Sequence, residues 1–334
     1  MHSSHPPSPP RDFDVLIVGG GPAGLSAALV LGRCRRSVLV IDAGHPRNYA
    51  SRWAHNYLTR DGIPPMELLR LGREEIASYG VQFKQGVVAK ADCLNPGYKV
   101  ELLSGESFTG RKLLLATGVT DVLPDIPNLE AFYGLGVHHC PYCDGYEYAD
   151  QPIAALGEPK KALGSAMNLR TWSPHITACS NGHRFNTLQR RRAAELGITL
   201  RPERIVKLET ITGGTPDAPL YGDPKQDFSV EHHHEPHRLA RIVFESGDPL
   251  PVAALFFNTD QVQRSDLPFS VGCVRNEKGG IHRDSRQRTQ VRDVYLAGDA
   301  SRDVQFVIVA AAEGAKAGVA INADFQKEER DVRS

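Results

Sequence analysis

The sequence contains no long hydrophobic run, because charged or polar residues interrupt every apolar stretch before the ~18 residues that a membrane-spanning helix needs. It also lacks an excess of either charge, since 39 Lys and Arg residues balance 39 Asp and Glu residues. This balance argues against a protein that binds nucleic acid or a membrane through a basic surface. The first ten residues, MHSSHPPSPP, contain no apolar segment of a secretory signal. We therefore expect a cytoplasmic protein with a disordered tail over residues 1–10.

Cysteine is scarce, and six cysteines among 334 residues are too few for a fold held together by disulfides. Four stand apart and are interpreted as small buried hydrophobic residues: Cys34, Cys93, Cys179 and Cys273. A zinc site needs four ligands, and the remaining pair, Cys140 and Cys143, has no second Cys-x-x-C to complete one. The histidine run 232–234 has no spaced Cys or acidic ligands around it. The sequence therefore predicts no metal site.

Alternating strand-like and helix-like segments account for most of the chain. An apolar run, a helix-forming segment and a second apolar run follow one another near the N-terminus, and a similar cycle begins near residue 151. The segments are 13–18, 25–32 and 37–41, and then 153–156, 161–171 and 175–179. Strands that are apolar on both faces are typical of parallel sheets covered by helices. The length suits two domains, so the sequence predicts an α/β protein with two Rossmann-like, three-layer (ββα) dinucleotide-binding domains.

A glycine-rich turn joins the first strand to the first helix. The residues that fill its G-x-G-x-x-G pattern are Gly19, Gly21, Pro22, Ala23 and Gly24. The first glycine permits a tight turn, the second lets a pyrophosphate approach the backbone, and the third lets helix and strand pack closely. Asp42 ends the next strand, where a carboxylate accepts hydrogen bonds from a ribose. The sequence therefore predicts that this turn binds a dinucleotide.

Cys140 and Cys143 lie in the sequence HCPYCDGYE, directly before Asp144. A Cys-x-x-C turn brings two sulfur atoms within bonding reach and lowers the pKa of one thiol, so a redox-active disulfide is the favoured interpretation. A carboxyl group beside it can take up or release the proton that thiolate chemistry requires. A purely structural pair of cysteines remains the alternative.

Two further motifs complete a pattern that resembles a known family. Ala116-Thr117-Gly118 ends an apolar strand, and Gly298-Asp299 follows the last strand and precedes an Ala-rich helix. With Cys-x-x-C-Asp between them, these motifs resemble the low-molecular-weight thioredoxin reductases, which are FAD-dependent pyridine-nucleotide-disulfide oxidoreductases. The resemblance extends over residues 12–322.

The resemblance implies a bound FAD and a division into domains. The FAD domain is expected in two pieces, 11–124 and 249–334, with a central NADPH-type domain over 125–248 inserted between them. The residues expected to bind FAD are Gly19, Gly21, Pro22, Ala23, Gly24, Asp42, Asn56, Thr117, Gly118, Asp299 and Gln305. Among these, Asp299 would hold the ribityl chain, and Gln305 would lie where a helix N-terminus points at the flavin pyrimidine. The family pattern also implies a homodimer.

The same resemblance implies roles for the redox residues. Cys143 would stack on the flavin, Cys140 would attack the disulfide of a thioredoxin-like partner, and Asp144 would donate the proton. Rotation of the central domain would alternately bury and expose the disulfide. Tyr142 replaces the small residue often found between the cysteines. The Pro141-Tyr142 pair also resembles relatives that act on small-molecule dithiols, such as the gliotoxin-type oxidoreductases.

The second αβ cycle departs from that family at its phosphate-binding turn. The sequence there is Gly157-Glu158-Pro159, so a proline occupies the position of the middle glycine. Proline lacks an N–H and places its ring in the space that a pyrophosphate would fill, and Glu158 adds negative charge. The basic run 190–192 is interpreted as a solvated helix face. NADPH binding is therefore doubtful.

The sequence accordingly predicts an FAD-dependent dithiol–disulfide oxidoreductase whose electron donor is not NADPH, for example a ferredoxin. Three alternatives stay open: a small-molecule dithiol oxidase that passes electrons to oxygen, an ordinary NADPH-dependent thioredoxin reductase, and a non-catalytic flavin-binding redox sensor. Neither nucleic acid nor a membrane is expected as a partner.

Overall fold

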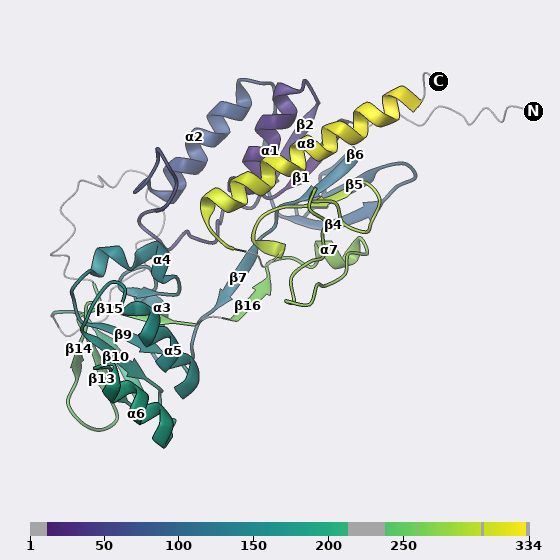
Figure 1. Cartoon of the computed structure of the whole chain (residues 1–334). Helices are drawn as coiled ribbons and strands as arrows, with labels where there is room; N and C mark the ends of the chain where they lie inside the picture. Colours follow the sequence, from purple (N-terminus) through teal and green to yellow (C-terminus); the bar gives the residue numbers. More distant parts are fainter. Residues whose placement is uncertain (1–11, 213–237, 259, 302–303, 332–334) are drawn as a thin grey trace, which may run out of the picture.

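The computed structural model describes residues 12–212, 238–258, 260–301 and 304–331. The N-terminal tail expected to be disordered and the histidine run 232–234 lie outside these residues. The described chain forms two parts, each built on its own parallel sheet (Figure 1).

The first part contains a seven-stranded sheet in the order β3-β2-β1-β6-β5-β4, with β17 also paired to β6. Its strands are β1 (Phe13–Val18), β2 (Val38–Asp42), β3 (Gln82–Gln85), β4 (Val88–Cys93), β5 (Tyr98–Leu102), β6 (Ser107–Leu115) and β17 (Val294–Leu296). The pairs around β1, together with β17 and β6, are parallel, whereas β4, β5 and β6 pair antiparallel. The central strand β1 is almost fully buried, as its apolar sequence predicts.

Helices α1 (Pro22–Arg33), α2 (Pro65–Ala77) and α8 (Val307–Asp331) lie together beside this sheet (Figure 1). Residues of all three join β1 and β2 in one hydrophobic core, and a second core lies on the other face with α7 (Leu267–Ser270). The contact between α1 and α8 depends on a glycine. A Cβ on Gly314 would lie 1.9 Å from the carbonyl oxygen of Ala23, so any larger residue would push the two helices apart.

The second part contains a five-stranded parallel sheet in the order β11-β10-β9-β15-β8. Its strands are β8 (Val137–His138), β9 (Ile153–Leu156), β10 (Ile176–Cys179), β11 (Thr199–Arg201) and β15 (Ala254–Phe257). Helices α5 (Pro159–Leu169) and α6 (Thr187–Glu195) connect these strands, and a separate sheet consists of β12 (Ile205–Glu209), β13 (Arg241–Phe244) and β14 (Leu250–Pro251). Three short helical segments complete this part: α3 (Leu129–Phe132), α4 (Pro141–Asp144) and η1 (Tyr146–Tyr148).

Two antiparallel strands join the two parts, and we call them the hinge strands. They are β7 (Val119–Val122), where the chain leaves the first part, and β16 (Asp260–Gln263), where it returns (Figure 1). The expected domain limits of 124 and 249 stay a prediction. Strand pairing places residues 254–257 in the second sheet, so the chain returns to the first part only through β16.

Several elements differ from the sequence-based expectations. Helix α5 begins at Pro159 rather than at residue 161, and the Ala-rich helix expected after Asp299 is α8, which spans 307–331. The short strands β3, β7 and β16 have no apolar periodicity, and their partners are distant in sequence. Tertiary pairing therefore creates strands that local sequence does not announce.

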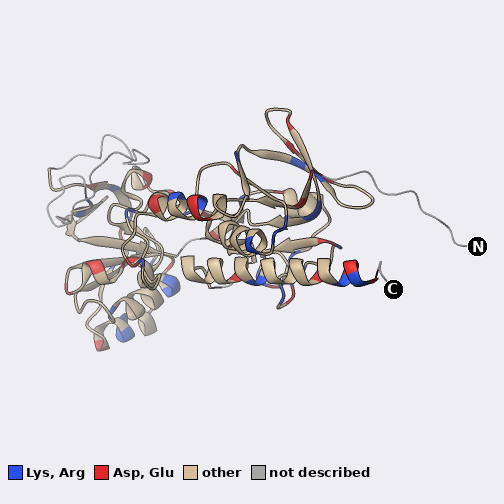
Figure 2. Cartoon of the chain, turned by 90° about the horizontal axis from the view of Figure 1, so that it is seen from above, with Lys and Arg blue, Asp and Glu red and all other residues tan. Residues whose placement is uncertain are grey.

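No helix of the described residues is both long enough and apolar enough to cross a membrane. Basic and acidic side chains are interspersed over both parts of the molecule, and neither sign dominates one end (Figure 2). This distribution agrees with the balanced charge of the sequence.

Candidate functional site

A cavity of about 430 Å³ lies between the carboxyl ends of the first sheet and the Cys-x-x-C segment of the second part. Most of the residues that the sequence singles out line it: Gly19, Gly21, Pro22, Ala23, Asp42, Thr117, Gly118, Cys140, Cys143, Asp144, Asp299 and Gln305. Gly24 and Asn56 are not among its lining residues. Segments more than 250 residues apart in the chain thus meet around one space.

The three motif glycines occupy different environments. Gly19 has φ of +108°, and a Cβ there would lie 2.2 Å from the carbonyl oxygen of Ala116. A Cβ on Gly24 would lie 1.9 Å from the carbonyl oxygen of Gly19, so these two glycines are required for close backbone packing. A Cβ on Gly21 would meet no atom within 4 Å, and this residue precedes α1 on the cavity wall. Gly21 therefore leaves room for a ligand beside a helix N-terminus.

Asp42 lies at the end of β2 and holds the glycine-rich turn. Its Oδ1 accepts the N–H of Gly20 at 2.9 Å, and its Oδ2 accepts the N–H of Gly44 at 3.1 Å. Arg73 from α2 lies 3.4 Å from the same carboxylate. The carboxylate is thus fixed at the cavity edge, and its expected bond to a ribose stays a prediction.

The cavity fits the FAD that the motifs imply. Thr117 Oγ1 is buried on the cavity wall and has no hydrogen-bond partner in the protein, so a polar group there remains to be satisfied. Gly118 follows with φ of +67°, and a Cβ there would meet no atom within 4 Å. An orphaned hydroxyl and two open glycine positions are the features expected where a polar cofactor touches the backbone.

Cys140 and Cys143 form a disulfide, with their Cα atoms 5.3 Å apart. The single turn of α4 carries them, because the N–H groups of Cys143 and Asp144 both bond to the carbonyl oxygen of Cys140. Both cysteines line the cavity. Asn56 reaches this turn from the first part, since its Nδ2 donates to the carbonyl oxygen of Tyr142 at 2.8 Å.

Asp144 pairs with His138, a residue that sequence reasoning missed. Asp144 Oδ1 lies 3.3 Å from His138 Nδ1, and the Nε2 of the same ring lies 2.9 Å from the hydroxyl of Tyr148. Burial alone would lower the pKa of His138, but the charge of Asp144 outweighs it and raises that pKa above its ordinary range. Burial alone would raise the pKa of Asp144, but His138 lowers it. The pair is therefore an imidazolium and a carboxylate at neutral pH.

Arg47, also missed, joins the two residues near the start of α8. Its Nη1 donates to Asp299 Oδ2 and to Gln305 Oε1, each at 2.9 Å. The same side chain pairs with Asp121 of the hinge strand β7. The sequence offered little reason to predict a role for Arg47 or His138. A single arginine in a loop and a His-His-Cys sequence both occur commonly for purely structural reasons. These partners are assembled by contacts across 74 and 252 residues of chain.

The turn before α5, residues 157–159, lacks the open glycine that precedes α1 in the first turn. Helix α5 begins at Pro159, with Glu158 at its N-cap position making no side-chain capping bond. The basic run on α6 behaves as a solvated face, because Arg191 and Arg192 pair with Glu195 of the same helix.

Two of the isolated cysteines are not where the sequence-based interpretation placed them. Cys179 and Cys273 are buried as expected, but Cys34 and Cys93 are exposed. Cys34 caps the C-terminus of α1, and Cys93 ends the edge strand β4, so neither position faces a core. Within the described ranges, no three His, Cys, Asp or Glu side chains are grouped to hold a metal ion.

Comparisons with known proteins give one family. The model of the pyridine nucleotide-disulphide oxidoreductase family matches residues 13–207. A probable thioredoxin reductase of Arthroderma benhamiae is 29% identical, over 98% of this chain and 84% of that protein. The thioredoxin reductase sirT of Leptosphaeria maculans is 28% identical over 94% of both chains.

Solved structures agree with the family match. The putative thioredoxin reductase TrxB of Bacillus anthracis has a TM-score of 0.84 and 28% identity, over 95% of this chain and 99% of that one. An oxidoreductase of Agrobacterium tumefaciens has a TM-score of 0.80 and 31% identity, over 94% and 98%. These similarities confirm the expected α/β fold with two Rossmann-like domains.

Proposed function

Because the chain belongs to the pyridine nucleotide-disulphide oxidoreductases, as a flavin-dependent enzyme resembling thioredoxin reductase, we propose that Cys140 and Cys143 exchange electrons with FAD held in the cavity. The observation that carries this assignment is geometric. A disulfide on the second part and a glycine-rich turn on the first part line the same cavity. A structural disulfide would have no need of this placement.

FAD, when bound, supplies a two-electron carrier beside the disulfide. The protein's own contribution is to hold it and to manage charge. We assign its binding to the predicted residues on the cavity wall, with Gly21 beside the pyrophosphate and Thr117 supplying a hydroxyl that lacks a protein partner. Asp299 and Gln305 are held at the start of α8 by Arg47.

Reduction of the disulfide requires two electrons and two protons, and it breaks the S–S bond to give two thiols. We assign the local proton store to the His138–Asp144 pair rather than to Asp144 alone. In the present arrangement the proton belongs on His138, because Asp144 is ionised. Asp144 lines the cavity with the cysteines and can relay that proton toward a thiolate.

The physiological partner is proposed to be a thioredoxin-like protein, and the donor to be something other than NADPH, for example a ferredoxin. Tyr142, between the two cysteines, and Tyr146, three residues after them, are 72% and 80% exposed, as expected for aromatic anchors of a docking surface. Glu158 at the N-cap of α5, where α1 has Gly21, supports the doubt about NADPH.

One observation favours a second candidate, oxidation of a small-molecule dithiol. The Tyr142 ring meets the rings of Trp172 at 5.5 Å and Phe306 at 6.5 Å, both edge to face, beside the disulfide. Such an aromatic wall suits a compact apolar molecule. In that reaction the dithiol loses two electrons and two protons to form a disulfide, and oxygen accepts them as hydrogen peroxide.

The decisive experiment reduces the flavin of the purified protein with light and then follows its reoxidation without oxygen. In the wild type we expect electrons to reach the disulfide, so that two thiols appear per chain. Cys143→Ser and Cys140→Ser should both lose this transfer, and Cys34→Ser, at an exposed cysteine outside the cavity, should retain it. Thiol formation that persists in both active-site variants would contradict the assignment. Parallel mixing with NADPH, reduced ferredoxin or a dithiol identifies the donor.

A further inference from the structure

Arg47 has an unusually complete set of contacts. A guanidinium carries five N–H groups and accepts no hydrogen bond. Nε and Nη2 donate to the two carboxylate oxygens of Asp121 at 2.8 and 2.7 Å. Nη1 donates to Asp299 and Gln305, each at 2.9 Å, and Nη2 lies 3.1 Å from His139 Nε2. Every donor of the side chain is therefore engaged.

These contacts join three regions of the structure. Arg47 lies in the loop after β2 of the first part, and Asp121 lies on the hinge strand β7. His139 belongs to the second part and directly precedes Cys140 of the disulfide. The arginine side chain is 15% exposed and that of Asp121 only 4%, so solvent screens their attraction little.

The geometry fixes the protonation state of His139. Because Arg47 can only donate, His139 Nε2 must accept and carries no proton. The ring proton then resides on Nδ1, which donates to the hydroxyl of Tyr133 at 2.8 Å. That hydroxyl lies 3.3 Å from Asp121 Oδ2 and donates to it. A closed circuit of hydrogen bonds thus holds His139 neutral.

The charges around His139 oppose one another. The groups that face it are Arg47 from the loop after β2, Asp121 from β7, Tyr133 after α3, His138 from β8 and Asp144 from α4. Burial lowers the pKa of His139, the two carboxylates raise it, and Arg47 and His138 lower it again. The net direction is downward, which agrees with the neutral ring that the hydrogen bonds require.

We propose that Arg47 is a positioning residue that clamps the disulfide segment to the flavin cavity through a neutral His139, and that opening this clamp is accompanied by protonation of His139. The inference rests on the proposed exchange of electrons between the cavity and the disulfide. Any rotation about the hinge strands that carries Cys140 away from the cavity also separates His139 from Arg47. His139 then loses its cationic neighbour and its burial, so below about pH 6.5 it gains a proton from solvent and cannot return until it releases that proton.

The first test observes His139 in the full, FAD-loaded chain by histidine-selective ¹⁵N NMR, with the signal assigned by its loss in His139→Asn. In the wild type we expect a neutral Nδ1–H ring across about pH 6 to 8. In Arg47→Met we expect a raised pKa, because Asp121 is no longer neutralised, and a mixture of tautomers. An unchanged tautomer and pKa in Arg47→Met would overturn the proposal.

The second test measures how readily Cys140 is alkylated by iodoacetamide after anaerobic reduction. Release of the clamp should raise the alkylation rate of Cys140 about tenfold in Arg47→Met. This increase corresponds to a loss of ~1.4 kcal/mol of clamping free energy. Arg47→Lys keeps the charge but cannot make five directed bonds. It should leave the His139 pKa low and still speed alkylation at least about threefold.

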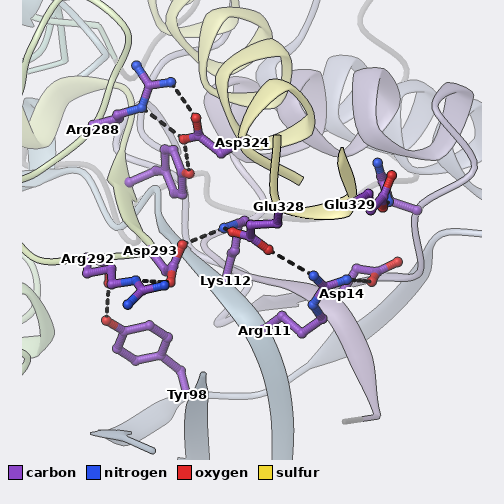
Figure 3. Close-up of polar contacts among 12 residues, drawn as sticks. Asp14, Tyr98, Arg111, Lys112, Arg288, Arg292, Asp293, Asp324, Glu328 and Glu329 are labelled. Atoms are coloured by element: carbon purple, nitrogen blue, oxygen red, sulfur yellow. Dashed lines mark hydrogen bonds and ion pairs between the residues drawn. The ribbon is translucent and has the colours of Figure 1, made fainter. Parts of the chain in front are cut away.

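Arg288→Met is the matched control. Arg288 binds Asp324 through Nε and Nη2 at 2.9 and 2.7 Å (Figure 3). The hydroxyl of Tyr295 donates to the same carboxylate. This pair has nearly the geometry of Arg47 and Asp121 but lies away from the cavity. The Arg288→Met variant should therefore leave the pKa of His139 and the alkylation rate of Cys140 at wild-type values. Equal acceleration of alkylation in the two methionine variants would show general loosening and would refute the clamp.

A folding defect in Arg47→Met would follow from the buried, unpaired Asp121. Arg47→Met with Asp121→Asn removes both charges together and should still speed alkylation. Neither readout requires turnover. A wild-type protein that fails to pass electrons to its disulfide would therefore contradict the proposed function. A His139 pKa and a Cys140 alkylation rate that stay at wild-type values in Arg47→Met would contradict only the clamp.

Discussion

Single glycines decide what the cavity can accept. Gly19 and Gly24 are pressed against backbone atoms, so a side chain at either position would distort the turn itself. Gly21 faces open space, so a side chain there changes the cavity without displacing the protein. Substitution of Gly21 therefore tests cofactor binding separately from folding.

We expect Gly21→Val to fold and to lose FAD. Its branched side chain would occupy the space beside the N-terminus of α1, where a pyrophosphate must approach the backbone. FAD content after gel filtration should fall at least about tenfold, the effect of losing one charge-assisted bond. Gly164→Val is the control, because a Cβ at this exposed α5 position also meets nothing within 4 Å. Full FAD occupancy in Gly21→Val would place the cofactor elsewhere.

The His138–Asp144 pair predicts a pH dependence of stability. The pKa of His138 is raised in the folded protein, so its contribution is complete below the unfolded value of ~6.5 and is lost as pH rises through the folded pKa. The pKa of Asp144 is lowered, so its contribution is present above ~4 and is lost as pH falls through the folded pKa. The pair should therefore stabilise the oxidised protein most between about pH 4 and 6.5.

Denaturant midpoints of wild type and His138→Asn, measured from pH 5 to 9, check this expectation. The free energy of unfolding that these midpoints give should differ most between the two proteins near pH 5.5. That difference should shrink by about 1 kcal/mol or more toward pH 9. His175→Asn, at an exposed position of the second part, should give no such trend. A difference that grows with pH would mean that His138 is neutral in the folded protein.

Among the elements, α5 bears on the electron donor. In the first part, α1 begins beside an open glycine, whereas α5 begins at Pro159 after an exposed Glu158. The two helices follow corresponding strands of two similar sheets, so the contrast comes from the turn residues. Both helices begin with a proline, Pro22 and Pro159, and so lack the same N–H. They differ at the N-cap residue, where Glu158 places a negative charge at the helix N-terminus that would bind phosphate.

NADPH should consequently be a poor reductant of the bound flavin. Repulsion between the Glu158 carboxylate and a phosphate about 4 Å away would cost ~1–4 kcal/mol, which corresponds to about five- to a thousandfold in affinity. Anaerobic titration followed by flavin absorbance measures this directly. Glu158→Gly should improve the apparent affinity for NADPH about tenfold, whereas Glu245→Gly, at an exposed loop position of the second part, should not. Stoichiometric bleaching by micromolar NADPH in the wild type would show that the turn is functional.

At the scale of the whole molecule, segments from both ends of the described chain form the first part, and the second part is inserted between them. Helix α8 returns from residue 307 to pack on α1 and on the first sheet. Lys112 of β6 is 1% exposed and binds both Asp293, before β17, and Glu328 of α8 (Figure 3). One buried cation therefore ties three distant segments together.

Lys112→Ala should destabilise the protein by about 2–4 kcal/mol, because it leaves two carboxylates facing each other without their cation. Lys112→Met should cost less, since it fills the same space and the carboxylates keep their contacts with Arg292 and Arg111. Thermal unfolding of the FAD-loaded protein measures both. Lys90→Ala, which removes an exposed pair with Asp92, should leave the unfolding temperature nearly unchanged. Equal effects of Lys112→Ala and Lys90→Ala would contradict the anchoring role.

The sequence by itself determined the local chemistry. The glycine turn, the Cys140–Cys143 pair and the main strands of both sheets depend on residues within a few positions of one another. Their spacing is therefore visible in one dimension. Short polar strands such as β7 and β16 gave no such signal, because each is stabilised by a partner about 140 residues away.

Tertiary structure alone decided which charges meet. His138 is only six residues from Asp144, but its identity as a partner depends on the turn of α4 and on burial beside Tyr148. The clamp of Arg47 unites residues 74 and 92 positions away, and no periodicity or spacing connects them. The physical reason is that hydrogen bonds and ion pairs act across space and are indifferent to the length of chain between the groups they join. The chain could thus be assigned a fold and a disulfide from its sequence, whereas the device that positions the disulfide became visible only in three dimensions.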